Sequence, residues 1–422
     1  ADGVDADTYR QAGTLLARIF LLQIFFYGLT AIGNSLLHAR RRFFAAAWAP
    51  VLADIPLIAS LLLVPSIVDG REPALAEVLT NDRLRWTLGL GATLGIAVTA
   101  LVLIPALRAA DVTIEWRPEI RHPAVRKLIR MSAWTFGYVV ANQIALVVVQ
   151  NLAEPGSGKL DAYTKAYLFF VLPHGLLAMS IVTTFAPEMA RSIQRRDRAG
   201  FIDRASLGAR LVLLLAVPAA AGMFVLRRPL IGLALERGNF DATDAARTSA
   251  ALAGFSLGLI GFSLYLFILR AFYAHEDART PFVINVFENL INIVVAVVLV
   301  GRYGVLGLAA SFAIAYTISS VFSLAALSYK VRGFTMRSVL SPLARMLLAG
   351  VVMAEVMWLV ARLVGDDEGW GALVRLTTAG VAGVAVYVVL LTVMQVPELQ
   401  QVRTRVMSRF TTAPAGAADQ AD

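Results

Sequence analysis

The feature that most constrains this chain is a series of apolar blocks, each roughly 20 residues long, with short polar gaps between them. A helix of roughly 20 residues crosses the ~30 Å hydrocarbon core of a bilayer. Because lipid offers the backbone no hydrogen-bond partner, such blocks are expected to be α-helices. Only 16% of the residues are charged, against about 25% in soluble domains. The sequence therefore predicts an all-α, polytopic membrane protein and argues against a chain of soluble domains.

About eleven membrane-spanning helices are expected. Their ranges are 14–37, 47–68, 86–108, 131–152, 162–186, 207–226, 246–273, 279–301, 304–329, 340–364 and 370–394. The gaps between them hold at most about 25 residues, which leaves no room for a soluble catalytic domain of ordinary size.

The basic residues alternate between the two sides of the membrane. Of the 38 Lys and Arg residues, 23 fall in loops expected on one side, 10 on the other and five inside spans. Short loops rich in Lys and Arg are cytoplasmic. The C-terminus is therefore expected on the cytoplasmic side of the membrane, and the bias explains the net charge of +9 without nucleic acid as a partner.

Because the number of expected spans is odd and the C-terminus is expected to be cytoplasmic, the start of the sequence is expected on the outer side of the membrane. The opening ADGVDAD is acidic and lacks both an initiating Met and a signal peptide. We therefore expect an N-terminal part with an odd number of helices to precede it. The alternative is that one helix is miscounted.

The sequence gives no support for an enzyme active site, so a transporter is expected rather than an enzyme. There is no cysteine and no H-E-x-x-H motif. The sequence GSGK at 156–159 resembles part of a phosphate-binding loop, but the full motif requires Gly at position 153 and Ser or Thr at position 160. Ala153 and Leu160 occupy these positions here. The HEDAR turn at 275–279 is too short to enclose a metal ion. Neither a metal site nor a cofactor is expected.

Polar residues inside spans are costly and are candidate functional residues. In the span 279–301, Asn285, Glu288 and Asn292 recur at intervals of three and four and so share one helix face. The functional interpretation is a cation or proton site that faces the interior. The alternative is hydrogen bonding between helices, which such residues also provide.

Three charged residues inside the expected spans are candidates for binding a substrate. Lys165 is a candidate cation for a phosphate group, Arg18 lies about one turn inside its helix, and Asp54 could pair with a cation between two lobes. Both cations could equally extend their side chains to the membrane surface. Helix packing is the alternative for Asp54.

A weak internal repeat relates spans 14–37 and 47–68, with their polar hairpin, to spans 246–273 and 279–301. The two units are six helices apart, so both point the same way. Parallel repeats of this kind occur in transporters with two similar lobes.

Four segments resemble the MurJ/MviN family. They are AIGNSLLHARRRFFAAAWAPVLADI, LERGNFDATD, RAFYAHEDARTPFV and LPHGLLAMSIVTTFAPEMAR. The resemblance implies a flippase for lipid II, the undecaprenyl-pyrophosphate-linked peptidoglycan precursor, which works by alternating access. It also implies a 14-helix, two-lobe fold of the MOP superfamily, of which the eleven spans would be the fourth to the fourteenth.

Under this resemblance the chain divides into three parts. Residues 1–226 would hold the rest of the N-terminal lobe and the start of the C-terminal lobe, residues 227–394 the remainder with the last two helices, and residues 395–422 a polar cytoplasmic tail. The resemblance implies an arginine five residues before the proline of the PHG sequence and an acidic residue two before it. This chain has Leu168 and Val171 at those positions, so Lys165 is predicted to replace the arginine. The many Arg and Ala residues look actinobacterial.

The implied partners are the lipid-linked substrate, membrane lipids and proteins of cell-wall synthesis. The membrane potential or a monovalent cation would drive the cycle. Alternative functions are export of another lipid-linked oligosaccharide, a multidrug/cation antiporter, and a membrane scaffold for cell-wall enzymes that transports nothing.

Overall fold

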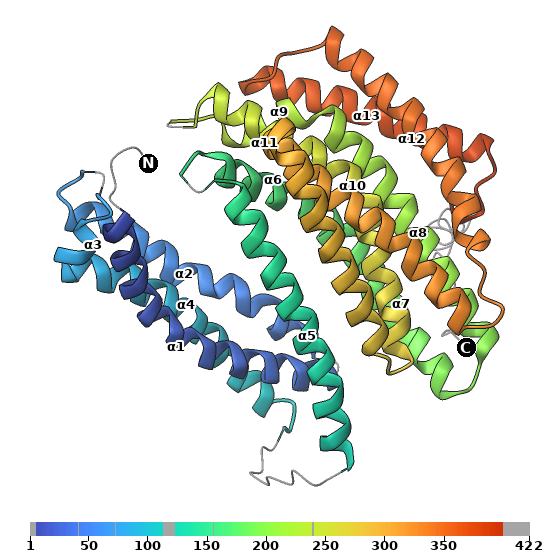
Figure 1. Cartoon of the computed structure of the whole chain (residues 1–422), viewed down its shortest axis with the longest axis horizontal. Helices are drawn as coiled ribbons and strands as arrows, with labels where there is room; N and C mark the ends of the chain where they lie inside the picture. Colours follow the sequence, from blue (N-terminus) through green and yellow to red (C-terminus); the bar gives the residue numbers. More distant parts are fainter. Residues whose placement is uncertain are drawn as a thin grey trace, which may run out of the picture. The chain divides into compact units, whose positions relative to one another are not determined.

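The protein is described by a computed structural model that covers residues 6–40, 42–71, 73–112, 123–154, 156–238 and 240–399. Every regular element in these ranges is a helix (Figure 1). The chain divides into two compact units, Ala1–Glu119 and Ile120–Asp422. The lobe boundaries expected from the sequence remain a prediction, and residues 400–422 of the expected tail lie outside the described residues.

The first unit is built on close contact between two long helices. Its elements are α1 (Ala6–Ala39), α2 (Phe43–Ile67), the short α3 (Glu77–Thr80) and α4 (Asp82–Arg108). A Cβ atom at Gly91 would lie 2.1 Å from Ser60 Oγ, and one at Gly95 would lie 2.5 Å from the Ala53 carbonyl oxygen. Glycines on α4 therefore let α2 approach closely, as small residues do between membrane helices.

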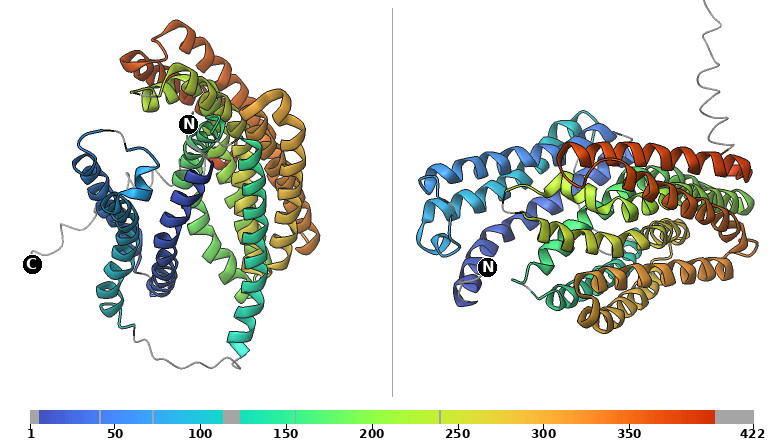
Figure 2. Two further views of the ribbon diagram at one scale, coloured as in Figure 1. Left: turned by 60° about the vertical axis from the view of Figure 1, so that its left-hand side comes forward. Right: turned by 90° about the horizontal axis from the view of Figure 1, so that it is seen from above.

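The second unit is a larger bundle, seen from two further directions in Figure 2. Its elements are α5 (Pro123–Leu152), α6 (Lys159–Pro173), η1 (His174–Ala178), α7 (Met179–Gln194), α8 (Arg198–Val225), α9 (Arg227–Leu235), α10 (Ala242–Ala274), α11 (Arg279–Lys330), α12 (Arg337–Leu363) and α13 (Gly369–Val393). Helix α10 lies at the centre, where it contacts α6, α7, α8, α9 and α11. Its Phe255, Tyr265, Phe267 and Phe272 are fully buried.

One membrane span is interrupted by a wide helical turn. Helix α6, the π-helical turn η1 and α7 run on as a single stretch from Lys159 to Gln194. The wide turn directly follows Pro173, which has no N–H to donate to the preceding turn. Wide turns of this kind relieve such local disruptions within membrane helices.

The eleven expected spans are confirmed as helices. Ten helices in the described part are long and apolar enough to cross a membrane, and α11, with 52 residues, contains two of the expected spans. The chain reverses at Gly304, whose φ of 54° and ψ of −131° are not helical. As a result Ser311 Oγ donates a hydrogen bond of 2.9 Å to Asn292 Oδ1. In a straight helix these two residues would be about 28 Å apart.

The segment that follows α13 is tied to the bundle. Val396 and Glu398 are buried, and the Glu398 carboxylate lies 2.9 Å from Nε of Arg210 on α8. Arg210 lies inside the expected span 207–226. The pair explains how this arginine is accommodated, since a charge inside a bundle is stabilised by an opposite charge.

The backbone at Gly304 yields a first prediction. Its φ and ψ lie in a region that is essentially restricted to glycine, and a side chain there costs about 1–3 kcal/mol. We expect Gly304→Ala to lower the thermal unfolding temperature of the purified protein. Gly301→Ala is the matched control, because a Cβ atom at Gly301 would have no atom within 4 Å. Equal unfolding temperatures for the two variants would show that the reversal does not require glycine.

Candidate functional site

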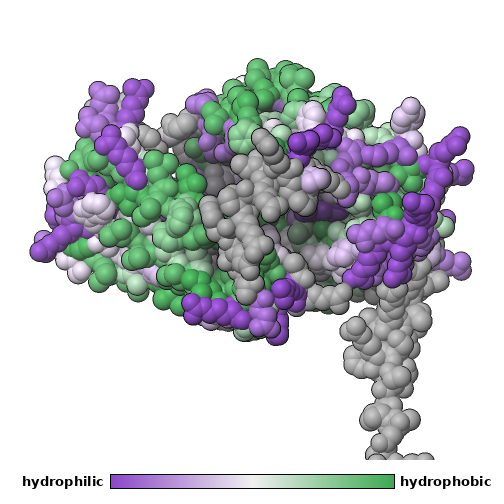
Figure 3. Space-filling model, turned by 90° about the horizontal axis from the view of Figure 1, so that it is seen from below, coloured by the Kyte–Doolittle hydropathy of each residue, from purple (hydrophilic) through white to green (hydrophobic). Residues whose placement is uncertain are grey.

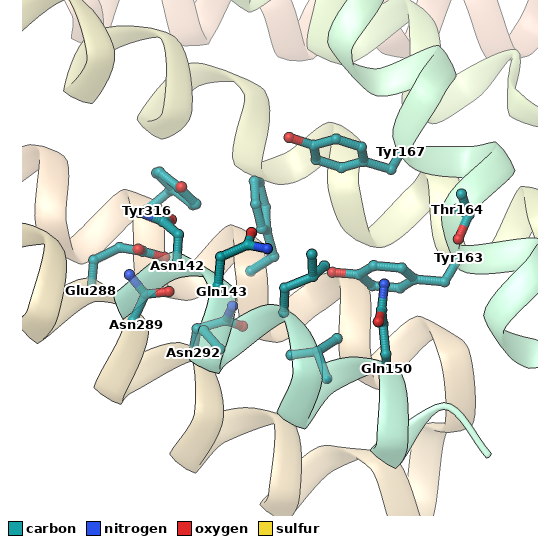
Figure 4. A pocket seen from close by; sticks show the side chains of 14 residues that line it. Asn142, Gln143, Gln150, Tyr163, Thr164, Tyr167, Glu288, Asn289, Asn292 and Tyr316 are labelled. Atoms are coloured by element: carbon teal, nitrogen blue, oxygen red, sulfur yellow. The ribbon is translucent and has the colours of Figure 1, made fainter. Parts of the chain in front are cut away.

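A polar cavity of about 310 Å³ lies inside the second unit (Figure 4). Helices α5 and α6 and both halves of α11 contribute its walls. Its polar lining comprises Asn142, Gln143, Gln150, Tyr163, Thr164, Tyr167, Glu288, Asn289, Asn292 and Tyr316. The cavity therefore joins segments that are more than 100 residues apart in the sequence.

Glu288 is the one ionisable carboxyl group that lines this cavity. It is 1% exposed, and neither carboxylate oxygen has a hydrogen-bond partner among the residues that the structure describes. Figure 4 shows the carboxylate beside the amides of Asn142 and Asn289. A bare carboxylate is expensive to bury away from water. The site therefore suits a proton on Glu288 or a cation beside it.

The neighbouring asparagines are largely engaged in hydrogen bonds between helices. Asn142 Nδ2 donates to Asn285 Oδ1 at 3.1 Å, which joins α5 to α11. Asn292 Oδ1 accepts the bond from Ser311 and so joins the two halves of α11. Asn285 is fully buried and does not line the cavity, whereas Asn292 does. The shared face predicted for Asn285, Glu288 and Asn292 thus contains both helix-joining bonds and a free carboxyl group.

Aromatic rings line the remaining wall of the cavity. Tyr163 and Tyr167 come from α6, and Phe312 and Tyr316 from the second half of α11. The Phe312 and Tyr316 rings lie 4.4 Å apart between centroids. Sequence reasoning did not select these two residues. Within an apolar span nothing marks them, and only the reversal at Gly304 brings them opposite Glu288.

Lys165 does not line the cavity. Its ammonium group pairs with Asp161 one turn earlier on α6 and lies 4.6 Å from the centroid of the Phe240 ring. The side chain is 34% exposed. A role of Lys165 in binding a phosphate therefore remains a prediction, and the local pair with Asp161 gives it a structural explanation as well.

Arg18 and Asp54 belong to the first unit, on α1 and α2. Both are exposed, and neither has an ion-pair partner within the described ranges of the chain. The structure does not bring these two residues together with Lys165 in one compact unit. Their predicted part in substrate binding is untested.

A second cavity, of about 690 Å³, is almost entirely apolar. It lies between η1, α7, α8, α12 and α13, and its lining includes Leu177, Ile181, Leu214, Met353, Met357, Val384, Val388 and Leu391. Tyr387 also lines it and donates a hydrogen bond from its hydroxyl group to the Leu214 carbonyl oxygen at 3.2 Å. This arrangement leaves a hydrocarbon-like hollow that suits an alkyl or polyprenyl chain.

The family model described as "Lipid II flippase MurJ" matches residues 1–378. "Probable lipid II flippase MurJ" of Haemophilus influenzae is 27% identical over 367 residues, which are 85% of this chain and 68% of that protein. The Vibrio cholerae protein of the same description is 26% identical over 386 residues, 89% and 70% of the two chains. "Lipid II flippase MurJ" of Burkholderia cenocepacia is 28% identical over 312 residues, 72% and 58%. The chain thus spans between 58% and 70% of the length of these relatives.

Solved structures confirm the fold. "Lipid II flippase MurJ, inward closed conformation" superposes with a TM-score of 0.66 at 23% identity, over 89% of this chain and 74% of that one. A MATE transporter in the bent conformation gives a TM-score of 0.60 at 14% identity, over 80% and 72%. Both likenesses agree with the MOP-type, all-helical membrane architecture predicted from the sequence. Since the family model covers nearly all of the membrane-spanning part, the chain belongs to the lipid II flippase MurJ family.

Proposed function

We propose that this chain translocates lipid II, a lipid-linked peptidoglycan precursor, across the bacterial plasma membrane. The observation that carries the proposal is the family match over residues 1–378. The curated relatives named above carry the description of a lipid II flippase, whereas the MATE transporters share only the fold. The comparisons therefore favour this function over a multidrug antiporter. Membrane lipids and proteins of cell-wall synthesis are the partners that the function implies.

The two cavities suit different ligands of a lipid flippase. The apolar cavity of about 690 Å³ can take part of a polyprenyl chain. The polar cavity of about 310 Å³ lies at the lower end of the range for ligand pockets, which is about 300–1,000 Å³. A disaccharide-peptide headgroup is larger than this, so the polar cavity suits an ion better than the whole headgroup.

We place the coupling ion of the cycle at Glu288. A proton or a monovalent cation would neutralise its buried carboxylate, and the amide oxygens of Asn142, Gln143 and Asn289 could complete a set of oxygen ligands. Loading and release would shift the balance between two arrangements of the helices around the cavity. The membrane potential would then act on a charge that moves within the bilayer.

Replacing Glu288 with Gln tests the coupling site. The substitution keeps the shape and removes the charge, so we expect transport to fall at least tenfold and to lose its dependence on the ion gradient. The measurement is complementation of a strain depleted of its lipid II flippase, with an assay of lipid II exposure on the outer face. Glu355→Gln is the matched control, since Glu355 also lies in a membrane-spanning helix but is exposed and outside the cavity. Wild-type complementation by Glu288→Gln would exclude the carboxyl group as the coupling site.

The role of Lys165 can be separated from its pair with Asp161. If Lys165 binds a phosphate of the substrate, Lys165→Glu should abolish complementation and Lys165→Arg should retain it. The charge swap Asp161→Lys with Lys165→Glu restores the local pair, yet it should remain inactive. Restored transport in the swap, or unchanged transport in Lys165→Glu, would assign Lys165 a structural role only.

The orientation of the chain can be tested by labelling, because the sequence contains no cysteine. We expect a membrane-impermeant maleimide to label Arg237→Cys in intact spheroplasts, and to label Glu276→Cys only after permeabilisation. The reason is that Glu276 lies at the more basic, cytoplasmic side, whereas Arg237 lies across the membrane at the other end of α10. Labelling of both sites in intact spheroplasts would overturn the topology.

A further inference from the structure

A third hollow, of about 320 Å³, opens at the basic end of the second unit. It lies where α7, α10 and α11 end and α8 begins. Its lining residues are Ser192, Ile193, Arg196, Arg198, Phe201, His275, Lys330, Val331 and Arg332. Figure 3 shows hydrophilic side chains gathered over the right-hand part of this face.

The charge of the lining is one-sided. It contains three arginines, one lysine and one histidine, and no acidic side chain. Lys330 is neutralised by an ion pair with Asp277. Arg196 and Arg332 are exposed and have no ion-pair partner in the part of the chain that the structure describes. Like charges this close together repel each other, and a bound anion would offset the repulsion.

The rim of the hollow is already held in place. The Arg198 guanidinium donates a hydrogen bond to the Arg332 carbonyl oxygen, which links the start of α8 to the turn after α11. Asp277 accepts bonds from the backbone N–H of Thr280 at 3.0 Å and from its hydroxyl group at 2.6 Å. Burial of Asp277 alone would raise its pKa, but the bonds from Lys330 and Thr280 outweigh it and lower the pKa. Asp277 therefore stays ionised and keeps Lys330 at the rim.

The floor of the hollow is apolar. Phe201 is fully buried, and the His275 ring meets it edge-on at 4.6 Å between centroids. His275 Nδ1 lies 2.9 Å from the Ala271 carbonyl oxygen, so in the neutral ring Nδ1 carries the proton and Nε2 is left for another partner. Ile193 and Val331 complete the apolar part. An occupant should thus be anionic at one side and apolar at the other.

We propose that this hollow binds a phosphate-bearing anion, supplied by the headgroup of an anionic phospholipid. Arginine guanidinium groups match phosphate oxygens in charge and in geometry. The hollow lies at the ends of membrane-crossing helices, which is the level of the headgroups, and basic pockets on the cytoplasmic side attract anionic lipids. The volume fits a glycerophosphate headgroup but not a whole lipid. The proposal is independent of the transported substrate.

Removing the two unpaired arginines tests this site. The full chain is purified in a neutral detergent, as wild type and as Arg196→Gln/Arg332→Gln. Binding of phosphatidylglycerol, phosphatidylcholine and inorganic phosphate is then measured by native mass spectrometry and by thermal shift. The matched control is Arg195→Gln/Arg337→Gln, which removes the same charge from two exposed arginines at the same end but outside the hollow.

We expect wild type and control to bind phosphatidylglycerol in preference to phosphatidylcholine, and the test variant to bind it at least tenfold more weakly. Inorganic phosphate that stabilises wild type but not the test variant, with no lipid preference, would support the phosphate site and assign it to a soluble phosphate. Equal loss of phosphatidylglycerol in test and control variants would overturn the proposal, because the effect would then be one of overall charge. Unchanged binding in the test variant would overturn it as well.

Discussion

In a bilayer each crossing segment must satisfy its own backbone hydrogen bonds, and the architecture of this chain follows from that requirement. Every regular element in the described ranges is helical. Departures from ideal helix occur where the chain has a local reason for them, at Gly304 and in the turn after Pro173. Since lipid contributes little hydrophobic drive between helices, their contacts depend on small residues and polar bonds instead. Gly91 against Ser60 and Asn142 with Asn285 are examples.

The same requirement distinguishes the buried polar groups from one another. Several of them form hydrogen bonds between helical segments, as Asn285, Asn292 and Ser311 do, and others bond to the backbone of their own helix, as Asn289 and Ser256 do. Arg210 and Glu398 neutralise each other. Glu288 does neither, although it is almost fully buried and faces a cavity. The contrast with its neighbours on the same helix marks Glu288 as the group whose charge must be met by something other than the protein.

Much of the fold could be predicted from the sequence, because apolar length and the distribution of Lys and Arg act locally along the chain. The reversal between spans 279–301 and 304–329 was also predictable, since only Arg302 and Tyr303 separate the two apolar blocks and Gly304 follows them directly. Glu288 stood out because a carboxyl group is rare in such a block. Other features depend on contacts between distant segments. Phe312 and Tyr316 look like ordinary apolar positions until α11 folds back.

Other parts of the site needed the structure for the same reason. The sequence shows Asp161 four residues before Lys165, but only the structure shows that the two are paired and that Phe240 lies nearby. Asn285 appeared equivalent to Asn292, yet it lies behind the cavity and not at its surface. The arginines around the third hollow come from two separate turns, and no spacing in the sequence relates Arg196 to Arg332.

The wide turn at His174–Ala178 has a consequence for the register of its helix. A π-helical turn holds one residue more than an α-helical turn, so it rotates everything that follows by about 100° around the axis. Before the turn, Tyr163 and Tyr167 face the polar cavity; at and beyond it, Leu177 and Ile181 face the apolar one. The extra residue thus lets one continuous membrane helix line the polar cavity with its first part and the apolar cavity with its second part.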